Sequence, residues 1–261
     1  MSDTLNVTVC QLDTREAQRA AALAALAEHV ASTGSDLVVL PELPYSDWLA
    51  AEPVADPARW RRSVTEHEAG IARLAELGAA SVISSRPTIE ATGSRRNQAF
   101  VWTAPTGAAR IRDKYYLPDE PGFWEASWYD RGEPTFDTCR VAGARVGVLL
   151  CTDLWFFEWA RHYARSGVEM LCVPRATPGE SLAKWLAGGQ AAAVCSGAYC
   201  LSSNHWIPTG SGLDGGGLGW VIDPDGAVLA TTTPDEPFVT VQIDLDVARR
   251  AKTTYPRYVR E

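Results

Sequence analysis

The sequence predicts an α/β fold, and three observations indicate it. Short, continuous apolar runs such as Asp36–Leu40 and Val146–Leu150 are typical of strands buried on both faces of a parallel sheet. These runs alternate with longer helix-compatible segments, in the order βαβ…ββ…βαβα…ββ. No internal repeat, linker or low-complexity stretch interrupts that order. We therefore expect one domain over residues 1–261, in which helices cover sheets.

The predicted strands are alternating or apolar runs bounded by turn residues. They cover residues 6–12, 36–40, 79–84, 97–103, 108–112, 146–150, 169–173, 199–203, 215–223, 227–231 and 239–243. Turns at 105–107 and 223–226 connect the hairpins among them.

The predicted helices follow four of these strands. Thr14 is expected to cap an Ala-rich helix that runs to about Ser32, where Gly34 ends it. Further helices are expected at about 57–77, directly after Cys151, and at about 181–198. Residues 113–134 have little periodicity and are rich in Pro, Gly and aromatic residues. A loop of this length inside one domain is usually functional.

Composition excludes several classes of partner. The net charge is -8, and no basic stretch interleaves with aromatic residues, so neither nucleic acid nor an anionic membrane surface is an expected partner. The first residues lack a basic segment followed by a long apolar one, which argues against a secretion signal. The six cysteines form no CxxC pair and the four histidines are scattered, which favours reduced thiols in a cytoplasm and no metal site.

Three ionisable residues share one kind of position. Glu42 follows the run VVLP, Lys114 follows ARIRD, and Cys151 follows VGVLL. If these strands share a sheet, their carboxyl ends lie together. A carboxylate could then take the thiol proton, and an ammonium could stabilise a developing oxyanion. The start of the helix after Cys151 could also hold the sulfur as a thiolate. A buried structural cysteine, a strand-end salt bridge and a solvated lysine are the alternative interpretations.

A cysteine–histidine site is a rival hypothesis. His205 follows the strand YCLSSN, and His162 lies in the helix after Cys151. His29 and His67 fall in helical stretches and are expected to be solvated. The sequence contains neither a GxSxG nucleophile motif nor a Gly-rich phosphate loop after a strand.

Three blocks resemble the signatures of the nitrilase (carbon–nitrogen hydrolase) superfamily. They are LVVLPE at 37–42, RDKYYLPDEPGFWE at 112–125 and VGVLLCTDLWFFEWAR at 146–161, in the family's order and spacing. Supporting similarities are Asn97, VPRAT at 173–177, SSN at 202–204 and GGLGWVIDPDG at 216–226. The resemblance covers almost the whole chain.

The resemblance implies a set of catalytic roles. Glu42 would be the general base, Lys114 the oxyanion stabiliser and Cys151 the nucleophile that forms an acyl-enzyme. The backbone N–H of Thr152 would be a second oxyanion donor. The loop after the lysine matches K-x-H-x-P-D-x-P-G-x-x-E of the carbamoylase branch, which selects Glu125 as a further carboxylate.

The sequence departs from the family pattern at several positions. Tyr116 stands at the usual His, Phe157 at the usual Pro, and residues 192–196 read AAVCS instead of the usual Arg-Ala-x-(Glu/Asp)-Asn. Cys-Thr-Asp at the nucleophile, instead of the Cys-Trp-Glu of true nitrilases, favours an amide or carbamoyl substrate over a nitrile. Arg175 is expected either to bind a substrate carboxylate or to pair with an internal acid or a subunit contact.

The resemblance also implies an architecture, a four-layer α-β-β-α sandwich that forms a homodimer or a higher homo-oligomer. The apolar segment after the nucleophile would lie in the interface or in the core. No metal or organic cofactor is implied. The tryptophans beside the pocket loops suggest aromatic walls or core packing (Trp48, Trp124, Trp128, Trp155, Trp206).

An amide or N-carbamoyl hydrolase is the leading hypothesis for the function. An acyl or carbamoyl transferase, a nitrilase and a non-catalytic binding protein are the alternatives.

Overall fold

A computed structural model of the protein describes residues 3–207 and 215–259. Its strands form one hydrogen-bonded sheet with the order β5-β4-β3-β2-β1-β9-β8-β7-β6. Only two residue pairs, Gln11 with Asn204 and Leu12 with His205, join β1 to β9. The sheet therefore divides at this junction into two halves.

Each half-sheet has parallel strands at its centre and antiparallel strands outside them. The first half consists of β1 (Thr4–Leu12), β2 (Leu37–Val39), β3 (Ser81–Ile89), β4 (Arg95–Thr103), β5 (Gly107–Asp113) and β13 (Phe238–Asp244). The second half consists of β6 (Thr138–Val141), β7 (Ala144–Val148), β8 (Met170–Pro174), β9 (Tyr199–Ile207), β10 (Gly215–Gly216), β11 (Trp220–Ile222) and β12 (Val228–Thr231).

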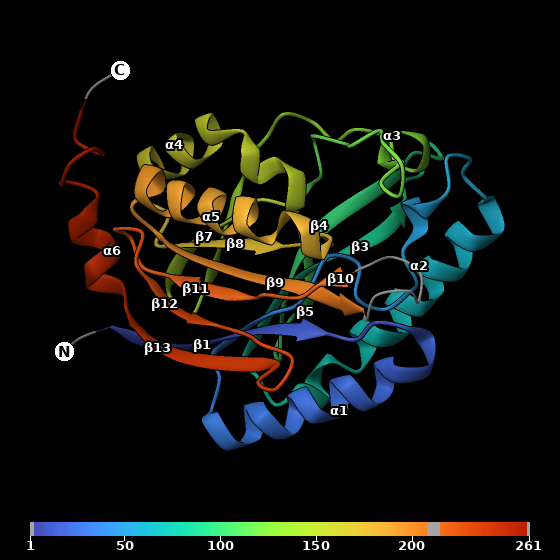
Figure 1. The fold of residues 1–261 in the computed structure, drawn as a ribbon, viewed down its shortest axis with the longest axis horizontal. Helices are drawn as coiled ribbons and strands as arrows, with labels where there is room; N and C mark the ends of the chain where they lie inside the picture. Colours follow the sequence, from blue (N-terminus) through green and yellow to red (C-terminus); the bar gives the residue numbers. More distant parts are fainter. Residues whose placement is uncertain (1–2, 208–214, 260–261) are drawn as a thin grey trace.

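The described residues contain six helices, not all of them on the outer faces, because Leu245 and Ala248 of the last helix pack between the half-sheets. The helices are α1 (Glu16–Thr33), α2 (Pro57–Ala72), α3 (Glu125–Trp128), α4 (Phe157–Arg165), α5 (Leu182–Ser196) and α6 (Leu245–Ala251). Short 3₁₀ turns join them, namely η1 (Leu49–Ala51), η2 (Leu74–Leu77), η3 (Cys151–Trp155) and η4 (Gly179–Ser181). Helices α4 and α5 lie on one side of the strands and α1 lies on the opposite side (Figure 1).

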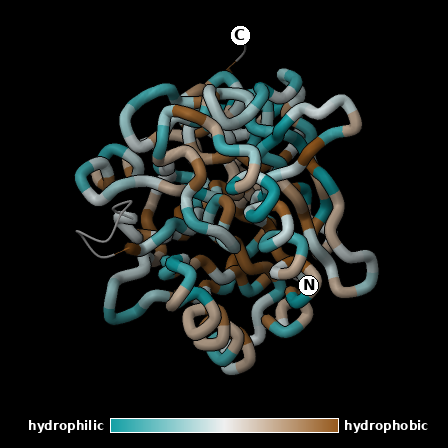
Figure 2. Tube along the Cα trace, turned by 90° about the vertical axis from the view of Figure 1, so that its right-hand side faces the viewer, coloured by the Kyte–Doolittle hydropathy of each residue, from teal (hydrophilic) through white to brown (hydrophobic). Residues whose placement is uncertain are grey.

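Both faces of the central strands are buried, which explains their continuous apolar runs. Val9 and Val148, from opposite halves, belong to one buried cluster between the half-sheets. On the outer faces, Leu12 shares a cluster with Leu26 of α1, and Leu171 shares another with α4 and α5. Hydrophobic segments accordingly gather in the interior of the trace (Figure 2). The predicted four-layer α-β-β-α architecture is confirmed.

Most predicted elements are present, with several differences. The strand expected at 215–223 is divided into β10 and β11, and the loop expected at 113–134 contains α3. Thr14 does not cap α1, because its hydroxyl lies 2.5 Å from Nδ1 of His205; the N-cap is Arg15, which makes no capping bond from its side chain. Gly34 does end α1 in the left-handed region, as predicted. The helix expected at 57–77 is interrupted at Arg73, which separates α2 from η2. Sequence reasoning missed β6 and α6, although Asp244 supplies α6 with a capping carboxylate.

In the two described stretches of chain, no helix combines the length and the apolar character that a membrane crossing requires. The expectations about the start of the chain and about a single domain over 1–261 also involve residues 1–2, 208–214 and 260–261, which lie outside the described residues. The single domain stays a prediction.

Candidate active site

Glu42 is held in place by bonds to its backbone and its side chain. Its N–H donates to the carbonyl of Arg175 at 3.2 Å, and its own carbonyl accepts from Nε2 of His205 at 2.5 Å. The carboxylate is fully buried, and its Oε1 accepts from Nδ2 of Asn97 at 2.7 Å. The other oxygen, Oε2, is buried without a hydrogen-bond partner among the described residues. Glu42 is therefore fixed in orientation and keeps one oxygen available for a proton.

Lys114 lies between two buried carboxylates. Its Nζ is 2.8 Å from Oε1 of Glu42 and 2.7 Å from Oε1 of Glu125, and all three side chains are at most 1% exposed. Burial opposes the charge on Lys114, but Glu125 and Glu42 outweigh it and raise the pKa of the ammonium. Burial raises the pKa of Glu125 to about 8 although Lys114 lowers it. The structure thus brings together the predicted Glu42, Lys114 and Glu125, each from a different segment.

Cys151 begins the turn η3, which Leu149 and Leu150 separate from β7, and it has a positive φ of 46° and an almost completely buried side chain. Burial and then Glu42 raise the pKa of its thiol, Lys114 lowers it, and Glu125 raises it again. The Sγ of Cys151 lies 4.0 Å from the carbonyl oxygen of Ala176. This rise in the thiol pKa argues against the thiolate expected at the helix start. The charge of Lys114 is already shared between two carboxylates, and η3 is only one short turn.

A buried ion pair supports the turn that carries the nucleophile. Nη1 of Arg112 lies 2.6 Å from Oδ2 of Asp153, and both side chains are fully buried. Asp153 also accepts from the backbone N–H groups of Tyr116, at 3.0 Å, and Leu150, at 3.3 Å. Sequence reasoning assigned no role to Arg112 or Asp153, although each stands beside a residue of the candidate site in its signature block.

Thr152 and Arg175 were also expected in the site. Thr152 is in the first turn of η3, where N–H groups lack a partner inside the helix, and its role as an oxyanion donor stays a prediction. Arg175 is fully buried, and it donates to the hydroxyls of Ser202 and Thr177 and to the carbonyl of Leu218. None of these partners is an acid. That Arg175 binds a substrate carboxylate stays a prediction.

The histidines do not form a cysteine–histidine pair with Cys151 in this geometry. Both ring nitrogens of His205 are bonded, to Thr14 and to the carbonyl of Glu42, and burial lowers its pKa to about 4. His162 contacts the rings of Trp159 and Tyr163. His67, expected in solvent, is buried, and burial lowers its pKa to about 3.

The aromatic residues near the site mostly serve packing. Trp48 and Trp128 belong to a buried cluster beside α3, and Trp155 is 38% exposed and contacts Trp185. Tyr116, one of the departures from the family pattern, stacks on Phe156 with ring centroids 3.2 Å apart. The ring at position 116 therefore joins the loop after β5 to the segment after the nucleophile. Among the described residues, no group of three or more His, Cys, Asp or Glu side chains is arranged to hold a metal ion.

Comparisons with known proteins identify relatives of this chain. A family model described as carbon-nitrogen hydrolase matches residues 6–253. A chloroplastic omega-amidase of Arabidopsis thaliana is 28% identical over 274 residues, which cover 96% of this chain and 70% of that protein. An N-carbamoylputrescine amidase of the same plant is 26% identical over 181 residues, covering 64% of this chain and 60% of that protein.

Solved structures share the fold. A carbon-nitrogen hydrolase from Helicobacter pylori G27 superposes with a TM-score of 0.87 at 22% identity, covering 99% of this chain and 95% of that one. An amidase from Nesterenkonia sp. superposes with a TM-score of 0.76 at 22% identity, covering 95% and 93%. On the family match and this common fold, the chain belongs to the carbon–nitrogen hydrolase family of enzymes, which act on C–N bonds other than peptide bonds.

Proposed function

We propose that the protein is a thiol amidohydrolase that cleaves a small amide or N-carbamoyl compound through an acyl-enzyme on Cys151. The observation that carries the proposal is the position of Lys114, buried between Glu42 and Glu125 and electrostatically coupled to the Cys151 sulfur. An ammonium fixed in a dry site stabilises a developing negative charge more strongly than it would in water.

In the first half of the reaction, Oε2 of Glu42 takes the proton of the Cys151 thiol while the sulfur attacks the substrate carbonyl carbon. Because the thiol has a raised pKa, the proton leaves during the attack and not before it. The oxygen of the tetrahedral intermediate is stabilised by Lys114 and by the N–H of Thr152. When the C–N bond breaks, Glu42 returns the proton to the leaving amine.

In the second half, water replaces the amine. Glu42 takes a proton from the water as its oxygen attacks the thioester, and it returns that proton to the sulfur as the C–S bond breaks, which releases the acid and restores the thiol. For an N-carbamoyl substrate the released acid is a carbamic acid. Glu125 positions Lys114 throughout, because it shares the ammonium with Glu42 at a similar distance.

The substrate class rests on the residues after the nucleophile and on the relatives. Cys-Thr-Asp at 151–153 favours amides and carbamoyl compounds over nitriles, and the similar plant proteins are named for an omega-amidase and an N-carbamoylputrescine amidase activity. Arg175 is kept as a candidate for substrate binding. In its described contacts, however, it holds the Thr177 hydroxyl and the Leu218 carbonyl.

Mass spectrometry of the intact protein tests the proposal. After incubation with a panel of short amides and N-carbamoyl compounds, we expect an acyl adduct on Cys151 and free ammonia or amine in solution. The Cys151→Ala variant should form no adduct. An adduct whose product appears only after an amine acceptor is added would instead assign a transferase, and turnover of nitriles alone would assign a nitrilase.

The cellular setting is part of the same proposal: a cytoplasmic enzyme that forms a homodimer or a higher homo-oligomer. Phe156 and Phe157 are only partly buried in the chain, and Trp155 is more exposed, so the segment after the nucleophile offers an apolar surface to a second copy. Light scattering on the purified protein gives the mass of the assembly, and a monomer at micromolar concentration would contradict the oligomer.

A further inference from the structure

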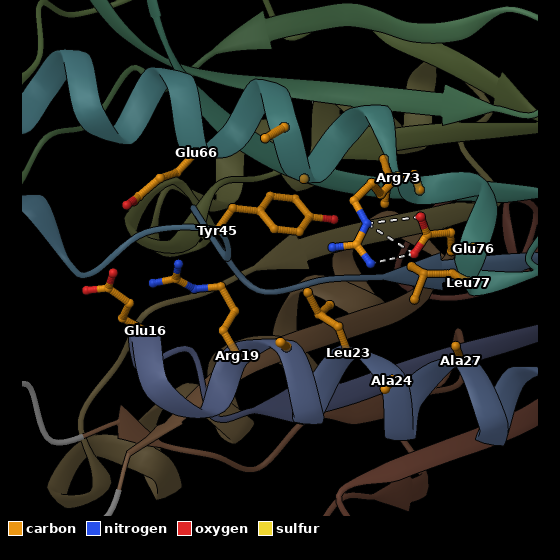
Figure 3. A pocket seen from close by; sticks show the side chains of 14 residues that line it. Glu16, Arg19, Leu23, Ala24, Ala27, Tyr45, Glu66, Arg73, Glu76 and Leu77 are labelled. Atoms are coloured by element: carbon orange, nitrogen blue, oxygen red, sulfur yellow. Dashed lines mark hydrogen bonds and ion pairs between the residues drawn. The ribbon is translucent and has the colours of Figure 1, made fainter.

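A groove separates α1 from α2 and η2 on the outer face of the first half-sheet. Its volume is about 510 Å³, within the range of small-molecule sites. Its sides are mainly apolar, with Leu23, Ala24 and Ala27 from α1 and Leu77 from η2 (Figure 3). None of the candidate catalytic residues lines it. The groove is therefore a separate site.

Tyr45 supplies a polar group inside this groove. Its side chain lies between the two helices in Figure 3, the residue is only 4% exposed, and the hydroxyl has no hydrogen-bond partner in the described stretches. A Cβ on Gly70 would lie 2.4 Å from the Tyr45 ring, so only glycine leaves room for the ring there. Burial and Cys10 raise the pKa of Tyr45, which keeps the hydroxyl protonated. The hydroxyl can both donate and accept.

The charged residues at the rim are already paired. Arg73 pairs with Glu76 at 2.8 Å, as the dashed lines in Figure 3 show. Arg19 is 3.4 Å from Asp47, and Arg62 contacts both Glu16 and Glu66. Neither a cation nor an anion would find an unpaired counter-charge at this rim. The lining therefore favours an uncharged ligand.

We propose that this groove binds a small, uncharged molecule with an apolar body and one hydrogen-bonding group that pairs with the Tyr45 hydroxyl. The apolar body contacts the alanines and leucines of α1 and η2. The polar group pairs with the hydroxyl, which has no hydrogen-bond partner among the described residues. Tyr45 lies on the same loop as Glu42, three residues further along the chain, so the ligand would sit against the segment that carries the proposed base.

N-phenyl-1-naphthylamine is a suitable probe, because it is uncharged and apolar, has one N–H, and fluoresces more strongly out of water. Titrated into the full chain, it should give a saturable rise in fluorescence with one molecule per chain. Ala24→Phe fills the groove and should weaken binding at least tenfold. Ala25→Phe is the matched control, because Ala25 is exposed on the same helix and does not line the groove; it should bind as the wild type does.

A second variant tests the hydrogen bond. Tyr45→Phe keeps the ring and should weaken binding about three- to tenfold, the range for loss of one hydrogen bond. Circular dichroism spectra like that of the wild type show that each variant is folded. The proposal is overturned if the wild type shows no saturable binding, or if Ala24→Phe and Ala25→Phe bind equally. It is also overturned if the groove proves to be covered by a second copy, seen as self-association that Ala24→Phe abolishes.

Discussion

Arg112 and Asp153 form an ion pair at 2.6 Å in which both side chains are fully buried. Arg112 is the second-last residue of β5 in the first half-sheet, and Asp153 lies in the nucleophile turn of the second. The guanidinium also lies 3.9 Å from the ring centroid of Phe136, which covers its face. The pair therefore fixes the distance between the strand that leads to Lys114 and the turn that begins at Cys151.

Asp153→Asn is expected to lower the free energy of unfolding by about 3–5 kcal/mol, because it leaves the Arg112 charge buried and unpaired. Urea denaturation measures the change. Glu76→Gln is the control, since the side chains of Glu76 and its partner Arg73 are 60% and 72% exposed and exposed pairs contribute at most about 1 kcal/mol. Equal losses in the two variants would show that the buried Arg112–Asp153 pair contributes no more to the free energy of unfolding than an exposed pair does.

Lys114→Ala and Cys151→Ala should both abolish measurable turnover. Loss of an oxyanion-stabilising group alone costs about 100-fold or more in rate, and loss of the nucleophile removes the acyl-enzyme. His205→Ala should retain a readily measured share of turnover, because its nitrogens bond to Thr14 and to the Glu42 carbonyl and not to the sulfur. Ammonia release by Lys114→Ala at the wild-type rate would refute the assigned roles.

Glu125 should make the native state less stable as the pH rises. Its pKa is raised from 4.5 to about 8, so between these values the native state keeps a proton that the unfolded state has released. Stability contributed by this group is therefore lost as pH rises through that window. Unfolding experiments at pH 5, 6.5 and 8 should show the wild type losing stability relative to Glu125→Gln.

The exposed Glu120 on the same loop provides the control for that comparison. The difference in the free energy of unfolding between the wild type and Glu120→Gln should stay constant over the same pH values. A constant difference between wild type and Glu125→Gln as well would mean that the carboxyl titrates at its ordinary pKa.

The resting state of Cys151 can be measured by thiolate absorbance near 240 nm. Since burial and Glu42 raise the pKa of this thiol, the difference spectrum between the wild type and Cys151→Ala should contain no thiolate band at pH 7. A clear band at that pH would indicate a preformed thiolate and remove the need for a base in the first step.

Periodicity and apolar runs were sufficient to predict the layers. Runs such as Val146–Leu150 alternate their side chains between two buried faces, and this alternation is a local property of the strand. The strand β6 was missed because it has only four residues and they are mixed in polarity. It joins β7 through Ala142 and Gly143, which both have a positive φ. Nothing in its apolar pattern marks it as a strand.

The candidate site could be predicted only as far as its residues belong to signature blocks. Glu42, Lys114 and Glu125 come together as expected, although 83 positions separate the first from the last. The raised pKa of the Cys151 thiol could not be predicted, because it depends on burial and on how many charges share one pocket. The buried position of His67 could not be predicted either, because it depends on which face of α2 meets the core.

Because only two residue pairs join β1 to β9, side-chain and loop bonds must hold the half-sheets in relative position near the pocket. The bonds from Glu42 to Arg175 and to His205, and that from Arg112 to Asp153, all cross the boundary. The half-sheets also pack on each other through the buried cluster that contains Val9 and Val148. The distance between the Cys151 sulfur and the Glu42 carboxylate therefore depends on the volume of that interior as well as on strand register. A larger residue in the central layer, remote from the pocket, would change the reaction rate while every ladder of each half stayed intact.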